Sequence, residues 1–186
     1  MALPDSLPKL TYEDYLLFPE DGLRHEILDG EHHVSASPFT AHQDVFSNLH
    51  SFLHPFVRRH RLGKVYGAPL DVVLSPHDVV VPDLLFISAE RLRILTEKNV
   101  QGAPDLVIEI LSRSTRHRDE GIKLERYDLF GVLEYWTFDP EQKAARVFRR
   151  PGRRLTLAAA LSAQAGDVLT TTLLPGLEIP LDEVFE

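Results

Sequence analysis

The chain has 186 residues, of which 44% are hydrophobic and 26% charged, a composition typical of a folded domain with its own core. It contains no cysteine, which excludes disulfides, thiolate catalysis, zinc ribbons and iron–sulfur clusters. The net charge of −8 argues against a nucleic-acid partner, but residues 1–31 hold eight acids and two bases and residues 167–186 hold five acids and no base, so the middle of the chain has a net charge of +3. With no secretory signal and no apolar run of about 18 residues, the sequence predicts one cytoplasmic domain over residues 1–186, with no membrane partner.

The first elements are a short helix and a β-hairpin. Thr11 followed by Asp14 resembles a capping box and predicts a helix that ends near Phe18. The hairpin has strands over residues 24–28 and 32–35, joined by the turn signal Asp29-Gly30.

A long amphipathic helix is predicted over residues 39–62. Val45, Leu49 and Phe52 recur at spacings of three and four, Pro55 should kink the helix, and Gly63 should end it. Two valine-rich strands, over residues 64–74 and 79–87, are expected to pair as a second hairpin.

The next strand, over residues 105–111, is almost wholly apolar and therefore expected to be central in a sheet. A second helix over residues 117–130 follows, then two strands over residues 134–138 and 144–148, and one or two further strands near the C-terminus. Hairpins followed by strand–helix–strand indicate a mixed α/β fold, with the helices at 39–62 and 117–130 covering the sheet.

Two carboxylates interrupt the apolar strands. Asp83 shares one face of the predicted strand with Val81 and Leu85, because side chains alternate between the two faces. The neighbouring Pro82 suggests that this position lies at a sheet edge or in a β-bulge. Glu109 stands in the same way within the central strand. A buried carboxylate needs a cation, a metal or a proton, so the pair predicts a divalent-metal site; pairing with structural arginines is the alternative.

The second helix supplies a cation near these acids. Lys123, Tyr127 and Phe130 form one stripe, which places Lys123 on or beside the inward face. The alternatives are that Lys123 extends past the rings to solvent, or pairs with Asp119 on the surface. Glu26 has charged neighbours, which favours a solvated strand edge.

Together these segments resemble the PD-(D/E)XK nuclease superfamily, and within it the restriction-endonuclease-like bacterial proteins of the Uma-two family. The resemblance covers about residues 23–150, in order. The matching segments are 25–31, 41–43, 68–72, 81–86, 102–112, 123–127 and 131–136. The resemblance implies a restriction endonuclease-like core, with a central mixed β-sheet flanked by helices and extra strands at both ends.

The resemblance also assigns roles to residues. Asp83 and Glu109 correspond to the metal-binding acids and Glu26 to an additional acid that binds metal. The position of the signature lysine, two residues after the second acid, is Leu111, but some branches carry the lysine on the following helix, where Lys123 lies. His42 corresponds to a supporting histidine of the family.

These assignments imply a Mg²⁺- or Mn²⁺-dependent endonuclease-like phosphodiesterase that hydrolyses DNA. Three arginines between the second acid and the lysine, Arg113, Arg116 and Arg118, would contact flanking phosphates or form a solvated loop. Nucleases of this superfamily commonly act as homodimers, and the long helix and residues 173–177 are candidate interfaces or core.

Two alternatives remain. Leu111 and the overall negative charge favour a catalytically inactive nuclease fold that acts as a nucleic-acid-binding or assembly module. In that case Asp83 should pair with an arginine. The other alternative is a metal-dependent hydrolase of a small phosphate ester.

Overall fold

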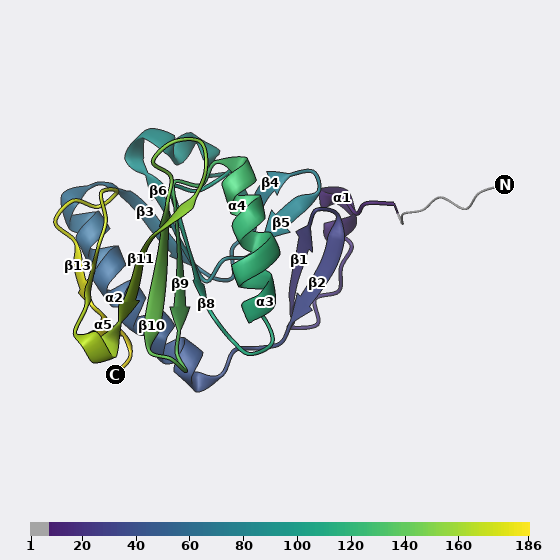
Figure 1. Ribbon diagram of the computed structural model, residues 1–186. Helices are drawn as coiled ribbons and strands as arrows, with labels where there is room; N and C mark the ends of the chain where they lie inside the picture. Colours follow the sequence, from purple (N-terminus) through teal and green to yellow (C-terminus); the bar gives the residue numbers. More distant parts are fainter. Residues whose placement is uncertain (1–7) are drawn as a thin grey trace.

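A six-stranded mixed sheet forms the centre of the computed structural model, which describes residues 8–186 (Figure 1). Its strand order is β11-β10-β9-β8-β6-β3, and only the pair β8–β9 is parallel among these neighbours. The strands are β3 (Gly63–Gly67), β6 (Leu84–Ser88), β8 (Leu106–Ile110), β9 (Glu134–Asp139), β10 (Ala144–Arg149) and β11 (Thr156–Ser162). The expected central strand is confirmed, because all five residues of β8 are buried.

A second sheet of five strands has the order β2-β1-β5-β4-β7. Its strands are β1 (Arg24–Leu28), β2 (Glu31–Ser35), β4 (Val72–Ser75), β5 (Asp78–Val80) and β7 (Val100–Gln101). The predicted hairpin of β1 and β2 is confirmed, with Ile27 paired to His32.

The second predicted hairpin is wrong in one respect, because both of its long strands are divided between the two sheets. β4 pairs with β5 in one sheet, whereas β3 pairs with β6 in the other. The two breaks contain Pro69 and Pro82, which have no backbone N–H to donate to a ladder. As a result Asp83 lies between β5 and β6 rather than within a strand, and its carbonyl accepts a hydrogen bond from the N–H of Ala68 at 2.9 Å.

The two predicted helices cover the six-stranded sheet, as expected, and they lie on opposite sides of it (Figure 1). On β8, Leu106, Ile108 and Ile110 pack in the cluster beneath α2 (Thr40–His60), whereas Val107 packs in the cluster that contains Tyr127 of α4 (Leu124–Phe130). Glu109 alternates with Ile108 and Ile110, so it faces the α4 side.

The long helix is confirmed, and it ends slightly earlier than predicted. α2 continues through Pro55 and ends at His60, and its C-cap Arg61 adopts the left-handed conformation with φ 57° before Gly63 begins β3. Its buried face packs against the sheet and against α5 (Leu181–Val184).

The second predicted helix is not continuous. It consists of α3 (Arg116–Arg118), a π-helical turn η2 (Asp119–Lys123) and α4. Gly121 has φ −109° and ψ −105°, outside the helical region, and both Asp119 and Lys123 of this turn are buried. Such π-helical turns are frequent at functional sites.

The remaining elements are short, and all but η1 lie near the two ends of the described chain. They are α1 (Tyr12–Tyr15), η1 (Ala89–Ile94), η3 (Ala163–Ala165), β12 (Val168–Thr170) and β13 (Glu178–Pro180). The predicted capping box of Thr11 and Asp14 is present. Leu174 and Leu177 are buried in the core beside α2, so this segment and the apolar face of α2 serve the interior of the protein rather than an interface between copies.

No helix within residues 8–186 combines the length and the hydropathy needed to cross a lipid bilayer.

Candidate active site

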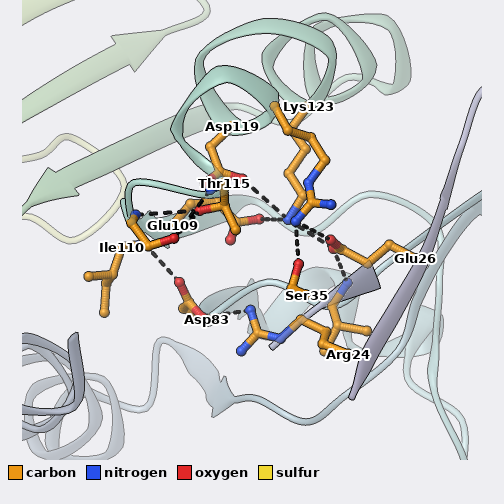
Figure 2. Close-up of polar contacts among 12 residues, drawn as sticks. Arg24, Glu26, Ser35, Asp83, Glu109, Ile110, Thr115, Asp119 and Lys123 are labelled. Atoms are coloured by element: carbon orange, nitrogen blue, oxygen red, sulfur yellow. Dashed lines mark hydrogen bonds and ion pairs between the residues drawn. The ribbon is translucent and has the colours of Figure 1, made fainter. Parts of the chain in front are cut away.

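Four side chains predicted or considered from the sequence meet in one buried cluster (Figure 2). Lys123 Nζ lies 2.8 Å from Glu26 Oε1, 2.9 Å from Glu109 Oε1 and 3.7 Å from Asp119 Oδ1. All four side chains are at most 3% exposed. Lys123 therefore neither extends to solvent nor forms a surface pair with Asp119, and Glu26 does not lie at a solvated strand edge.

The convergence follows from the fold. Glu109 on β8 lies on the face of the six-stranded sheet that α4 covers, and Lys123 in the π-helical turn lies opposite it. Figure 1 shows α3 and α4 between that sheet and the hairpin of β1 and β2, so Glu26 on β1 approaches Lys123 from the other side. Glu26 is buried because β1 faces the helical segment that carries Lys123. The charged sequence neighbours of Glu26 do not indicate this burial.

Two neutral donors hold the glutamates in place. The hydroxyl of Tyr127, one turn after Lys123, donates to Glu109 Oε1 at 2.8 Å. The backbone N–H of Val81 donates to Glu26 Oε1 at 2.9 Å. Both glutamates are thus oriented by the surrounding fold as well as by the ammonium group.

Asp83 lies beside this cluster, with partners of its own. Arg24 Nη1 lies 2.8 Å from Oδ1, while His42 Nε2 at 3.1 Å and the N–H of Ile110 at 2.8 Å contact Oδ2. Asp83 is 2% exposed. Burial opposes its ionisation, but His42 and Arg24 outweigh burial and lower its pKa to about 2.

The pKa values of the cluster reflect an excess of buried acid. Burial raises the pKa of Glu109 to about 8, with Asp83, Asp119 and Glu26 adding to the effect and Lys123 opposing it. Burial also raises the pKa of Asp119. Burial opposes ionisation of Glu26, but Lys123 outweighs it and its pKa is lowered. Burial by itself would lower the pKa of Lys123, but the nearby carboxylates of Glu109 and Glu26 outweigh burial and raise this pKa.

The cluster forms part of the wall of a cavity of about 620 Å³. The three predicted arginines all line this cavity, but each is paired. Arg113 Nε lies 2.5 Å from Glu141 Oε1, Arg116 Nη1 lies 2.7 Å from Asp139 Oδ2, and Arg118 Nη2 lies 3.8 Å from Glu26 Oε2. Arg118 therefore belongs to the buried cluster, whereas Arg113, which is 87% exposed, lies at the rim.

The donor set fits a divalent cation by its chemistry. Glu26, Asp83, Glu109 and Asp119 offer hard carboxylate oxygens, and the permanent cations near them are Lys123, Arg24 and Arg118, one fewer than the acids. Glu26 Oε2 is buried and has no hydrogen-bond partner among the described residues, so a further positive charge would satisfy it. In the arrangement described for residues 8–186, the ammonium group lies between the glutamates, and no three acidic or histidine side chains are placed so that they could hold a metal ion together.

The sequence did not indicate three contributors to the site. Arg24 is 59 residues from Asp83, and its neighbours gave no sign of the pairing. Asp119 was related to Lys123 by helical spacing, but only as a surface pair, and its burial was not expected. The sequence placed Tyr127 in the stripe with Lys123 and Phe130, but it did not indicate that the Tyr127 hydroxyl donates to Glu109.

Comparison with known proteins agrees with this fold. Residues 12–182 match the family Uma2, described as "Putative restriction endonuclease". Among solved structures, the chain is similar to one described as a "putative nuclease belonging to DUF820" from Anabaena variabilis ATCC 29413, with a TM-score of 0.78, 18% sequence identity, and coverage of 95% of this chain and 97% of that chain. No curated protein matches. The structural likeness concerns the fold, whereas the sequence match extends over nearly the whole described chain, and the chain therefore belongs to the Uma2 family.

Proposed function

We propose that the protein is a divalent-metal-dependent nuclease that hydrolyses phosphodiester bonds of DNA in the 620 Å³ cavity. The observation that carries the proposal is the buried Lys123 ammonium, held within 2.9 Å of both Glu26 and Glu109 at the wall of that cavity. A lysine is rarely buried unless a paired acid compensates it, and perturbed groups of this kind cluster at functional sites. Membership of the Uma2 family supports the same class of activity.

Asp83, Glu109 and Glu26 would hold a Mg²⁺ or Mn²⁺ ion, because all three line the cavity and correspond to the metal-binding acids of the PD-(D/E)XK nucleases. Such an ion supplies Lewis acidity toward a phosphate and lowers the pKa of water. Binding would require Asp83 to exchange its contact with Arg24, since both of its oxygens already have partners.

The other groups of the site act through position and charge. Lys123 orients the attacking water and stabilises negative charge that develops on the phosphate in the transition state. Tyr127 and the N–H of Val81 keep the two glutamates oriented while the charges around them change. Arg113 and Arg116 at the rim exchange their acidic partners for flanking phosphates, which gives affinity that falls with salt. His42 supports Asp83 from α2.

One observation favours a second function. Asp83 is paired with Arg24, as expected of a nuclease fold that has lost its chemistry and serves as a nucleic-acid-binding or assembly module. The two proposals can be distinguished by experiment, because only the nuclease cleaves the nucleic acid, and it requires divalent ions to do so.

The test is an incubation with single-stranded, double-stranded and branched DNA, with Mg²⁺, with Mn²⁺ and with EDTA. We expect cleavage that depends on the ion and is lost in Asp83→Asn, Glu109→Gln and Lys123→Met, but is retained in Asp44→Asn, which removes an exposed carboxylate of α2. Binding of DNA without cleavage under every condition would favour the inactive module. Cleavage of a chromogenic phosphate ester alone would instead indicate a hydrolase of small esters.

The homodimer expected from the resemblance belongs to this proposal as well. A mass near 21.1 kDa in solution, which is that of one chain, would contradict it.

A further inference from the structure

A second cavity, of about 600 Å³, adjoins the one that holds the acid cluster. The two cavities share a wall formed by six residues: Arg24, Ala36, Ser37, Pro38, His42 and Asp83. The two cavities are therefore direct neighbours, and Arg24 lies between them. The proposed nuclease function uses only the first.

The second cavity is lined by aromatic rings. Tyr15, Phe18 and Phe46 line it, each half-buried, so that parts of the rings remain accessible. The ring of Phe18 is fixed by its neighbours, with centroids 5.6 Å from Tyr15 and 4.1 Å from His32. The hydroxyl of Tyr15 donates to Asp71 at 2.8 Å, which holds that ring as well.

Polar groups accompany the rings. Gln43, exposed on α2, presents an amide that donates and accepts hydrogen bonds as the edges of bases do. Arg24, in the wall between the cavities, is a guanidinium of the kind that binds phosphate. Rings to stack on, an amide for a base edge and a cation between two chambers are the elements with which proteins bind consecutive nucleotides of a single strand.

We propose that the second cavity binds the nucleobase next to the scissile phosphate, and that the preferred substrate is single-stranded DNA. The proposal rests on the proposed nuclease function for the location of the scissile phosphate. A paired base in a duplex is stacked on both faces, so it can lie against the rings of this cavity only after it is unpaired and unstacked. A single strand avoids this cost, because its bases are already free to turn outward.

Binding is measured by fluorescence anisotropy of labelled single-stranded and duplex oligonucleotides in EDTA, so that cleavage does not intervene. Stacking of one base on an aromatic side chain leads us to expect about a tenfold weaker affinity of Phe18→Ala for the single strand, with duplex affinity unchanged. Phe18→Trp should restore the affinity. Phe52→Ala, which removes a half-buried phenylalanine of α2 that lines neither cavity, should leave it unchanged. Equal affinity of Phe18→Ala and the unchanged protein for the single strand would overturn the proposal.

A second measurement needs no variant. Single strands that carry 5-iodouracil at one position are cross-linked to the unchanged protein by light, and the modified peptides are identified by mass spectrometry. We expect cross-links to Tyr15 or Phe18, whereas cross-links confined to residues outside the second cavity would contradict the proposal.

The outcome is separable from that of the proposed function. If the protein cleaves DNA but Phe18→Ala binds single strands normally, the nuclease remains and the base-binding cavity is lost. If the protein cleaves nothing but binds single strands through Phe18, the nuclease is lost and the base-binding cavity remains.

Discussion

Lys123 Nζ and Glu109 Oε1 are 2.9 Å apart, although they come from a π-helical turn and a central strand, and both side chains are 2% exposed. The position two residues after Glu109 is Leu111, which has no charge to offer the site. In the proposed site, Lys123 would take the place of the lysine that the nuclease signature carries on the strand, and it contacts Glu109 from the face of the sheet that α4 covers. The site therefore depends on the helical segment of residues 116–130 as well as on the sheet.

Lys123→Met should destabilise the protein. The substitution leaves Glu26, Glu109 and Asp119 buried without their shared cation, and breaking a buried pair from one side costs about 3–5 kcal/mol. Urea unfolding measures the loss, with Lys98→Met, at an exposed loop lysine, as the control. Equal free energies of unfolding for Lys123→Met and the unchanged protein would show that the ammonium group does not compensate these acids.

Glu109→Gln should flatten the dependence of stability on pH. The pKa of Glu109 rises from 4.5 to about 8 on folding, so between these values the folded state binds a proton that the unfolded state has released. Stability therefore falls as pH rises through this window. In EDTA, we expect the unchanged protein to lose more stability between about pH 5.5 and about pH 8.5 than Glu109→Gln does.

The control for this measurement is Glu90→Gln, which alters an exposed glutamate and should leave the pH dependence unchanged. A Glu109→Gln protein whose stability falls with pH as steeply as that of the unchanged protein would contradict the raised pKa.

Much of the fold follows from the sequence, because its signals are local. The hairpin of residues 24–35, the buried strand over 106–110 and the long helix each show their own periodicity or turn chemistry. The two acids that interrupt apolar runs, Asp83 and Glu109, were recognisable because a charge among buried neighbours needs a partner.

The remainder depends on contacts between distant segments. Pro69 and Pro82 mark where the strands over 64–74 and 79–87 are interrupted, but no local pattern specifies which sheet each half joins. The burial of Glu26 depends on a helix about 100 residues further along the chain, and the pairing of Arg24 with Asp83 spans 59 residues.

Arg24→Ala should strengthen the binding of divalent ions. Arg24 competes with a metal for Asp83 Oδ1 at 2.8 Å, and its removal leaves the acid cluster with one positive charge fewer. Calorimetric titration with Mn²⁺ should give a dissociation constant at least severalfold lower than that of the unchanged protein. Arg154→Ala, at an arginine whose side chain is 82% exposed, should bind as the unchanged protein does. Weaker binding by Arg24→Ala would indicate that Asp83 serves a structural ion pair.

Tyr127→Phe should lower both stability and cleavage. The hydroxyl donates to Glu109 Oε1 at 2.8 Å inside the protein, and loss of such a bond costs about 1 kcal/mol, or more because the acceptor stays buried. Cleavage should slow severalfold, since Glu109 loses its orientation. Tyr66→Phe, at a half-buried tyrosine of β3, is the control, and equal cleavage by the two variants would contradict a role for the Tyr127 hydroxyl.

The most direct test of the central claim is a crystal of the protein soaked in Mn²⁺ and measured for anomalous scattering. The account predicts one strong anomalous peak in contact with Asp83 and Glu109, accompanied by separation of Arg24 from Asp83. A crystal without a peak at these carboxylates, in which Arg24 keeps its contact with Asp83, would contradict it.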